Sequence, residues 1–540
     1  MILFLKCCYQ QILRPFVKNI PHNEYGESDY FEASKSTDNE FKLSKCKTFS
    51  TNQTLDPNEE FILVACAGSF KFGPWKSSRI VYRNAHAMVR SKENVKKKLK
   101  QPKDDKISVF IMAIDSVSRM NLIRGMPETY NHLESNGWFE MRGLNKIGDN
   151  THPNLMAMLT GHHNGDSEKV CKWDTEGELD KCYFIWNDYA DAGYVTAYAE
   201  DEAFLNTFSS FHVGFNKQPT DHYIRPFAIA IENKLEVKTF FERKTCVGYQ
   251  HYADFIYQYG LDFANKYKEK PSFGLFWTNS FSHEELSMVS TMDTRVLYYL
   301  KQLETQKILD SSIVIFLSDH GMRFGPIRDL YTGWLEERLP FFYMWLPEKF
   351  QSKHPKIVKN LRINRDRLAS PYDVHLTLKH ILQLSGGNGN LNDSRTLSCP
   401  DCRSLFSELP FDRSCHDAGI NKHWCTCVQR YDFDEKSKKV QKAVDFLIKQ
   451  MNEELSTYPK CAKLTLNMIK HVRGSKNRST IEYLISFNVK PSMASLEATV
   501  RCDKKCKIME RIGSISRTNR YGNQSSCIND EELRKICFCI

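Results

Sequence analysis

The chain has 540 residues and a mass of 62.9 kDa, a length that allows two to four domains and excludes a peptide or a scaffold held by disulfides alone. Its hydrophobic share of 41% and mean hydropathy of -0.50 indicate a folded, water-soluble protein and exclude a disordered, collagen-like or multi-span membrane chain. Lys and Arg outnumber Asp and Glu by 75 to 65, a net charge of +10 that solvated faces explain better than an anionic partner. Because no nucleic-acid-binding motif accompanies the basic runs, we expect no nucleic-acid partner.

Residues 1–104 are predicted to form an N-terminal module with strands, since short apolar runs such as 61–65 alternate there with polar loops. The apolar run at residues 1–5 ends at Lys6 and is too short to be a convincing signal peptide. No window reaches about 18 consecutive apolar residues, so we expect no transmembrane segment in this form.

Residues 105–390 are predicted to form an α/β domain with a largely parallel sheet flanked by helices. Short continuous apolar runs are typical of strands that are buried on both faces, and amphipathic stretches separate them here. The predicted strands are 107–114, 194–198, 273–277 and 313–317, and the predicted helices are 127–136, 153–160, 250–267 and 293–306.

Residues 391–540, after a Gly-rich linker at 386–389, are predicted to form a cysteine-rich α+β region. Eleven of the 18 cysteines lie in the last 142 residues, which favours disulfides and therefore the extracellular space or the lumen of the secretory pathway. A zinc site is the alternative, with ligands from Cys399, Cys402, Cys425, Cys427, His416 and His423. A helix is expected at 434–455, followed by strands at 463–472, 480–490 and 495–502. The sequence permits N-glycosylation at Asn52, Asn392, Asn477 and Asn523.

Two of the predicted buried strands end in aspartate. Asp115 follows the first strand, and Asp319 and His320 follow the last. Functional side chains of open α/β sheets collect at the carboxyl ends of strands, and carboxylate and imidazole groups are ligands of first-row metals. Either aspartate alone is also explained by capping of the next turn.

A third segment lies between them. Thr151 stands where a helix N-cap belongs, Pro153 fits the first helical turn, and Gly161 is placed to end the helix. Capping accounts for this pattern without catalysis. A threonine hydroxyl at a helix N-terminus is also well placed to become a metal-activated nucleophile toward phosphate or sulfate.

The order of these three segments resembles the alkaline phosphatase and sulfatase superfamily. More closely, strings such as "GDNTHPNLMAMLTG" and "SDHGMRFGPIRDLYTGWLEERLPFFYMWLP" resemble the DUF229 family of animal proteins, and the resemblance extends over most of the chain. It implies an alkaline-phosphatase-like fold for residues 105–390. It also implies one divalent metal ion, either Zn, Mn or Mg, held by Asp115, Thr151, Asp319 and His320.

The same resemblance assigns further roles. Thr151 and Asn154 of the Thr-His-Pro-Asn motif are candidate catalytic residues, and so is His283 as an acid or an orienting group. Arg119, Arg323 and Arg338 are candidates for anion binding, with salt bridges as the alternative. The second metal site of phosphatases maps to Asn279, His283 and Glu284, where Asn replaces the expected Asp, so we predict a single metal.

The sequence therefore predicts a metal-dependent hydrolase or transferase that uses a Thr nucleophile. Phosphate esters are favoured over sulfate esters as substrates, because the Cys/Ser-x-Pro-Ser-Arg context of sulfatases is absent from the sequence. A catalytically weak or inactive extracellular binding protein with the same fold is the first alternative. An intracellular zinc-ribbon interaction protein is the second.

Overall fold

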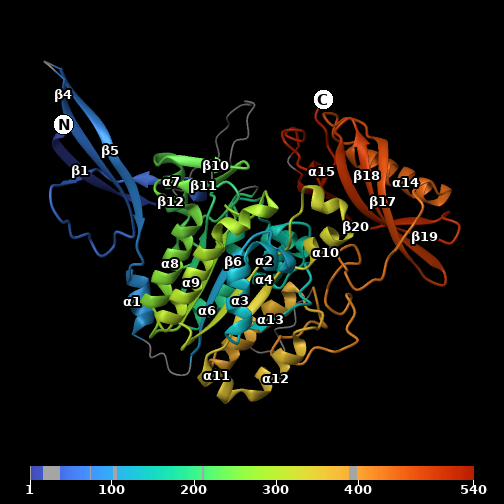
Figure 1. Ribbon diagram of the computed structural model, residues 1–540, viewed down its shortest axis with the longest axis horizontal. Coiled ribbons are helices and arrows are strands. Elements are labelled where there is room, and N and C mark those ends of the chain that lie inside the picture. The colour runs from blue at the N-terminus through green and yellow to red at the C-terminus, as the bar shows by residue number, and fades with distance from the viewer. Residues whose placement is uncertain are drawn as a thin grey trace.

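The computed structural model describes residues 2–15, 37–72, 75–100, 106–209, 212–387, 398–528 and 530–540. An N-terminal β-sheet lies at one end of the long axis, an α/β domain lies in the middle, and a β-rich C-terminal region lies at the other end (Figure 1).

The N-terminal part is an antiparallel sheet with the strand order β2-β1-β4-β5, in which β3 also pairs with β1. Two disulfides, Cys7–Cys66 and Cys8–Cys46, tie β1 to the rest of this part. Its elements are β1 (Ile2–Leu13), β2 (Lys42–Leu43), β3 (Lys47–Phe49), β4 (Phe61–Phe72), β5 (Trp75–Ala87) and α1 (Glu93–Leu99).

The central sheet has the strand order β7-β15-β14-β6-β13-β8-β9. From β14 to β9 the neighbouring strands are parallel. At the other edge, β15 pairs antiparallel with both of its neighbours, β14 and β7. The middle strands are buried on both faces, which explains their continuous apolar sequences. The strands are β6 (Ser108–Ile114), β7 (Phe139–Glu140), β8 (Val195–Glu200), β9 (His222–Tyr223), β13 (Ser272–Thr278), β14 (Ser312–Leu317) and β15 (Phe342–Trp345). A separate small sheet contains β10 (Val237–Phe240), β11 (Arg243–Val247) and β12 (Gln250–His251).

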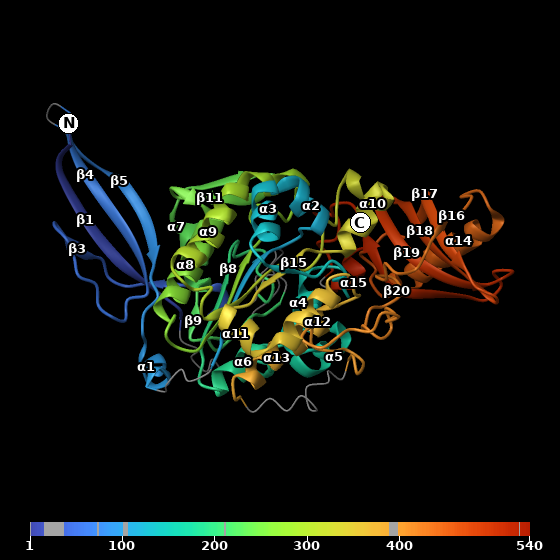
Figure 2. The ribbon, with the colours of Figure 1, turned by 60° about the horizontal axis from the view of Figure 1, so that its bottom comes forward.

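Helices cover both faces of the central sheet, with α8 and α9 on one face and α4, α6 and α13 on the other (Figure 2). Alternate side chains of β6 enter the two resulting cores. Phe110 and Met112 join the core that includes α8 and α9, whereas Val109 and Ile111 join the core that includes α4 and α13. The helices are α2 (Arg119–Gly125), α3 (Pro127–Ser135), α4 (Thr151–Thr160), α5 (Asn164–Cys171), α6 (Ile185–Asp191), α7 (Arg225–Lys234), α8 (Tyr252–Lys266), α9 (Asp293–Thr305), α10 (Tyr331–Arg338), α11 (Glu348–Lys353), α12 (Pro355–Asn364) and α13 (Pro371–Leu384).

The C-terminal region combines a disulfide-rich loop segment with an antiparallel sheet of order β16-β17-β18-β19-β20. Helix α14 buries an apolar stripe, which includes Val440, Val444 and Leu447, in a core that it shares with this sheet. The elements are β16 (Tyr431–Asp432), α14 (Lys438–Leu455), β17 (Thr465–Lys476), β18 (Thr480–Lys490), β19 (Ala494–Asp503), β20 (Met509–Arg517) and α15 (Glu531–Arg534).

The predicted fold class is confirmed: a largely parallel sheet is flanked by helices, and a cysteine-rich α+β region follows it. The predicted boundaries at 104–105 and 390–391 stay predictions, because they lie outside the described residues, as do Asn392 and the second half of the Gly-rich linker. Among the described helices, none combines the length and the apolar character that crossing a bilayer requires.

Candidate active site

Four neighbouring parallel strands of the central sheet end in polar residues at one edge. The register aligns these ends, because Leu317 of β14 pairs with Ala113 of β6. In the order β14, β6, β13 and β8, the side chains that follow the strand ends are Asp319, Asp115, Asn279 and Asp201. The carboxyl edge of the sheet is therefore the place where the predicted site residues meet.

Asp115, Asp319 and His320 form a compact buried cluster. One oxygen of each carboxylate and one ring nitrogen of His320 lie within 4.8 Å of one another. His320 Nε2 lies 3.3 Å from Asp319 Oδ2 and 3.8 Å from Asp115 Oδ1. Burial, followed by the negative charge of Asp319, raises the pKa of Asp115 to about 7. Burial lowers the pKa of His320 to about 4.

The cluster has the donor set of a divalent metal site. His320 Nδ1 lies 2.8 Å from the Gly321 carbonyl oxygen, which can only accept a hydrogen bond, so Nδ1 carries the hydrogen and the Nε2 lone pair faces the carboxylates. Asp319 Oδ2 is buried and has no hydrogen-bond partner among the described residues. Three acceptors converge here, and a divalent cation would offset the repulsion between them; metal–ligand distances of about 2.0–2.2 Å separate tetrahedral ligands by about 3.3 Å. The observed residues fit one metal ion.

Thr151 joins this cluster as the first residue of α4. Its hydroxyl donates a hydrogen bond to Asp115 Oδ1 at 2.9 Å and lies 3.4 Å from His320 Nε2. The expectation that Thr151 caps the helix is wrong, because the N-cap is Asn150 and α4 begins at Thr151. Gly161 ends the helix in the left-handed conformation, as expected. The Thr151 hydroxyl is thus directed at the cluster and not at the helix backbone.

Asn154 holds the loop before Thr151. Its Oδ1 accepts from the backbone N–H of Ile147 at 2.8 Å, and its Nδ2 donates to the Asn150 carbonyl at 2.8 Å. These bonds occupy both ends of the amide. These bonds fix the loop before Thr151, and the catalytic role of Asn154 stays a prediction.

Asn279, the first residue of the possible second metal site, makes hydrogen bonds with both ends of its amide. Its Oδ1 accepts from Trp277 Nε1 at 3.1 Å, and its Nδ2 donates to Glu200 Oε1 at 3.0 Å. Its backbone N–H donates to Asp201 at 2.6 Å. Burial raises the pKa of Asp201 to about 8. The Asn279 amide is thus part of a buried hydrogen-bond network, and the described residues show no second group of metal ligands at this edge.

His283 and Glu284 form a pair beside the first cluster. His283 Nδ1 lies 3.0 Å from Glu284 Oε1, and 21% of the His283 side chain is exposed. Burial opposes charging of the ring, but the hydrogen bond to Glu284 and the charge of Asp115 together raise the pKa of His283. Glu284 therefore makes protonation of the ring easier and uses Nδ1, which leaves Nε2 outside this pair.

The predicted anion-binding arginines are already paired with carboxylates. Arg119 Nε lies 2.6 Å from Glu140, and Arg323 Nη2 lies 3.0 Å from Asp149. Arg338 is fully buried and bonds Glu337 and Glu497 at 2.7 Å each. These ion pairs favour the salt-bridge alternative, although Arg323 remains close enough to His320 to lower its pKa.

His375 and His380 both lie on α13, which packs against the central sheet. His375 Nδ1 lies 3.1 Å from the Met158 carbonyl oxygen, and His380 Nδ1 lies 3.0 Å from Ser404 Oγ. Neither belongs to the metal cluster.

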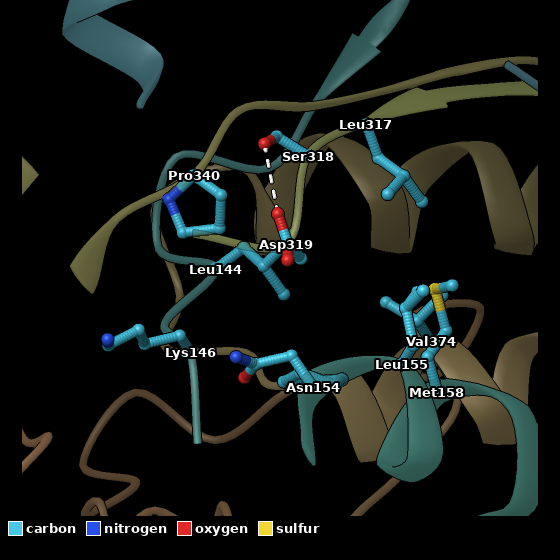
Figure 3. A pocket seen from close by; sticks show the side chains of 11 residues that line it. Leu144, Lys146, Asn154, Leu155, Met158, Leu317, Ser318, Asp319, Pro340 and Val374 are labelled. Carbon is cyan, nitrogen blue, oxygen red and sulfur yellow. Dashed lines mark hydrogen bonds between the residues drawn. The ribbon is translucent and has the colours of Figure 1, made fainter. Parts of the chain in front are cut away.

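A small cavity lies behind Asp319, between the end of β14, α4 and α13. Lys146, Asn154 and Ser318 are among its polar lining residues (Figure 3). Its volume of 20 Å³ has room for about one water molecule, which is too little for an ester. The partly exposed Thr151 side of the cluster is therefore the side from which a substrate can approach.

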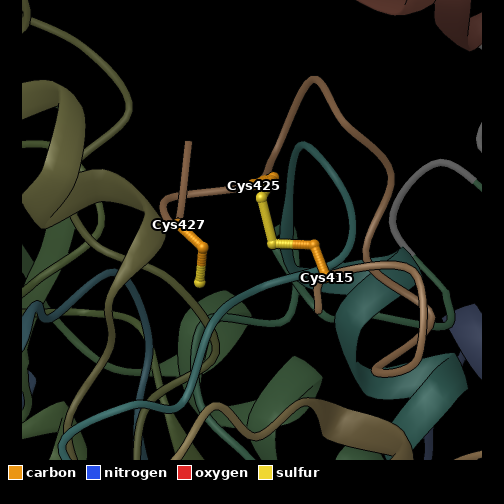
Figure 4. Close-up of side chains that lie close together, drawn as sticks. All are labelled: Cys415, Cys425 and Cys427. Carbon is orange, nitrogen blue, oxygen red and sulfur yellow. A yellow bond between two sulfur atoms is a disulfide. The ribbon is translucent and has the colours of Figure 1, made fainter. Parts of the chain in front are cut away.

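Most tail cysteines form disulfides, which occupies the sulfur atoms of all but one of the cysteines named for a zinc site. All 18 cysteines lie in the described residues, and only Cys246 and Cys427 are unpaired. Cys427 lies beside the Cys415–Cys425 bond (Figure 4). Ten of the eleven tail cysteines are paired, in Cys399–Cys402, Cys415–Cys425, Cys461–Cys537, Cys502–Cys506 and Cys527–Cys539, so the prediction of a disulfide-bonded tail is confirmed.

Sequence reasoning missed the residues that support the cluster. Ser116 has a φ of 62°, and its backbone N–H donates to Asp319 while its hydroxyl donates to Asp115. Gly321 is required because a Cβ there would lie 2.3 Å from the Glu336 carbonyl oxygen. In the sequence, only their positions next to Asp115 and His320 could have indicated that Ser116 and Gly321 support the cluster.

The chain belongs to the family described as "Protein of unknown function (DUF229)", whose model matches residues 5–470. The predicted family is thus confirmed. A search of curated proteins found no match to this sequence.

The chain is also similar to solved structures at low identity. A protein in the alkaline phosphatase superfamily from Vibrio parahaemolyticus is 15% identical with a TM-score of 0.40, and the match covers 80% of this chain and 86% of that one. A lipoteichoic acid synthase from Listeria monocytogenes is 13% identical with a TM-score of 0.37, covering 56% and 75%. A putative sulfatase from Bacteroides fragilis is 11% identical with a TM-score of 0.36, covering 75% and 91%. The functional argument below rests on the residues of this chain.

Proposed function

We propose that this protein is a metal-dependent hydrolase or transferase of phosphate esters with Thr151 as its nucleophile. The observation that carries the proposal is the position of the Thr151 hydroxyl, 2.9 Å from Asp115 Oδ1 and 3.4 Å from His320 Nε2. A side chain that only stabilised the start of a helix would bond to backbone N–H groups instead.

Asp115, Asp319 and His320 would hold one divalent ion, with the Thr151 oxygen as a further ligand. When bound, the ion supplies Lewis-acid chemistry that lowers the pKa of the hydroxyl and offsets charge on the phosphate. Asp115 Oδ1 accepts the Thr151 hydrogen and so fixes the direction of the oxygen lone pairs. The N-terminus of α4, at which Thr151 lies, favours a bound anion.

Thr151 Oγ1 would attack phosphorus in line, forming a phosphothreonine as the bond to the leaving group breaks. His283 is the candidate acid for the departing alcohol, because the hydrogen bond to Glu284 and the charge of Asp115 raise its pKa and Glu284 holds Nδ1. Water or an acceptor alcohol would then take the phosphoryl group from Thr151.

Phosphate is favoured over sulfate by the nucleophile. A threonine cannot be converted to the formylglycine that sulfatases use, and Thr151 occupies the nucleophile position. The eight disulfides support the extracellular space or the secretory lumen as the location of the proposed reaction, because such bonds persist in oxidising compartments.

The test compares three variants on p-nitrophenyl phosphate mono- and diesters. Thr151→Ala should lose at least about a thousandfold in kcat, whereas Thr151→Ser should keep measurable turnover and carry a phosphoryl group after acid quenching. Thr160→Ala is the matched control, because Thr160 ends the same helix and its hydroxyl bonds the Met156 carbonyl at 2.7 Å. Turnover by Thr151→Ala at the parent rate would refute the assignment of Thr151 as the nucleophile.

Asn279 favours a second candidate, a binding protein that has lost efficient catalysis. Its amide replaces the carboxylate of a two-metal site and is committed to structural bonds. Tight binding of phosphate esters without turnover by the metal-loaded parent protein would support this candidate.

A further inference from the structure

A segment near the C-terminus contacts three loops of the candidate active site. The contacts come from the segment between Arg520 and Lys535, which we call the 520–535 segment and in which residue 529 lies outside the described residues. The segment follows β20 and includes α15. Two disulfides, Cys461–Cys537 and Cys527–Cys539, attach it to the rest of the C-terminal region.

The first contacts hold the loop that precedes the nucleophile. Asn150 Nδ2 donates to Glu531 Oε1 at 2.9 Å. Asp149 Oδ2 lies 3.2 Å from Lys535 Nζ and 3.0 Å from Arg323 Nη2. Asn150 is the N-cap of α4 but makes no side-chain cap, so its amide contributes to docking of the 520–535 segment instead. The backbone just before Thr151 is therefore fixed by side chains from the end of the chain.

The second contact holds the partner of His283. Arg520 Nε lies 3.2 Å from Glu284 Oε2, and Arg520 Nη2 donates to the Glu284 carbonyl at 3.0 Å. Glu284 Oε1 is the oxygen that bonds His283 Nδ1. Each oxygen of this carboxylate thus has its own partner, and Arg520 limits the rotation that would turn Glu284 away from His283.

The third contact lies on the loop after His320. The ring of Tyr521 meets the ring of Phe324 edge-on, with centroids 6.3 Å apart. Loops that carry Thr151, His283 and His320 therefore all meet one segment, although they come from distant parts of the sequence.

We propose that the 520–535 segment is a positioning element of the active site, which aligns Thr151 through Asn150 and His283 through Glu284. This inference rests on the proposed function. The segment lies beyond residues 5–470, the part of the chain that the family model matches. None of these contacts, made by described residues of the segment, involves Asp115, Asp319 or His320, so the inference predicts an effect on kcat with metal content unchanged.

The first arm of the test changes Glu531. Glu531→Ala should lower kcat by about tenfold to a hundredfold with KM and bound metal unchanged, because a small misplacement of a nucleophile is costly. Glu531→Gln should restore the rate, because its amide oxygen can still accept from Asn150. Arg501→Ala is the matched control, since Arg501 lies in the same region and pairs with Glu482 and Glu510 away from the site.

The second arm changes Arg520 and compares leaving groups. Arg520→Ala should slow esters of alkyl alcohols, which need an acid, at least about tenfold more than p-nitrophenyl esters, which do not. Arg520→Lys should recover most of the loss by pairing with Glu284. A structural defect alone would slow both substrate classes equally.

The two proposals fail in different ways. If Glu531→Ala and Arg520→Ala both match the parent on both substrate classes while Thr151→Ala is inactive, the positioning role is refuted and the proposed function stands. If Thr151→Ala matches the parent, the proposed function is refuted together with this inference.

Discussion

Replacing Asn279 by Asp tests whether the second metal site can be rebuilt. In a two-metal relative this position is a carboxylate, so the substitution could be expected to restore a second ion. The structure predicts the opposite, because the new carboxylate oxygen would lie at the position of Nδ2, which is 3.0 Å from Glu200 Oε1. Asn279 is 2% exposed, so one of the two carboxyl groups must take up a proton to keep the contact.

The cost follows from the pKa of the introduced group. Protonating a carboxyl whose unfolded pKa is about 3.9 costs about 4 kcal/mol at pH 7 and about 1.5 kcal/mol at pH 5. The folded-state pKa is raised, so the destabilisation grows as the pH rises from the unfolded value toward the folded one. Asn279→Asp should therefore unfold at a much lower temperature than the parent at pH 7 and at a more similar temperature at pH 5.

Unfolding midpoints at the two pH values, with elemental analysis after dialysis, provide the measurement. Asn233→Asp is the control, because it adds the same charge at an exposed position of α7; it loses the bond from Nδ2 to the Ile229 carbonyl near the end of the helix, so it should lower the free energy of unfolding by about 1 kcal/mol, and by nearly the same amount at pH 7 and pH 5 because an exposed carboxylate is ionised at both. A variant that holds two metal equivalents and is as stable as the parent at pH 7 would contradict this reasoning.

Three further outcomes are expected. Alkylation without reductant, followed by mass spectrometry, should label Cys246 and Cys427 alone, and labelling of more than half of the tail cysteines would contradict the disulfide assignment. Elemental analysis should find one metal equivalent per chain. Asp319→Asn should lose this metal, whereas Asp329→Asn, which changes an exposed acid in the following loop, should keep it. If Asp319→Asn kept the metal, the assignment of Asp319 as a ligand would be refuted. Thr151→Ala should change the free energy of unfolding by about 1 kcal/mol, since it removes one hydrogen bond and no cap, and denaturant titration showing a loss above about 3 kcal/mol would assign Thr151 a structural role.

The middle of the central sheet could be predicted because its strands are buried on both faces. The runs at 107–114 and 313–317 correspond to β6 and β14 within one residue. The antiparallel edge strand β15 was missed, since the short apolar run at 341–346 that contains it has no period that separates strand from helix. In the tail, β20 was missed because its side chains are mostly half-buried or exposed, which leaves no clear alternation.

The candidate metal site could be predicted for a related reason. Its ligands directly follow two strands that the apolar pattern identifies, and β6 and β14 are neighbours in the sheet. The orientation of a single side chain carries no such signal. Thr151 was placed one position too early, as a cap, because the pattern of Thr, Pro and Gly does not distinguish an N-cap from the first helical residue.

The state of the second site depends on contacts that no local pattern contains. Asn279 on β13 bonds Glu200 at the end of β8, and the Glu284 carboxylate is held by Arg520, which lies 236 residues further along the chain. Around Glu284 the structure brings together imidazole and guanidinium groups, with Arg243 Nε 3.5 Å from the carboxylate that Arg520 also contacts. Fixed protein cations can stabilise a departing anion, and Arg520 is in place to do so only when the 520–535 segment is docked. The proposed chemistry at Thr151 and the proposed role of the C-terminal region therefore depend on the same set of contacts.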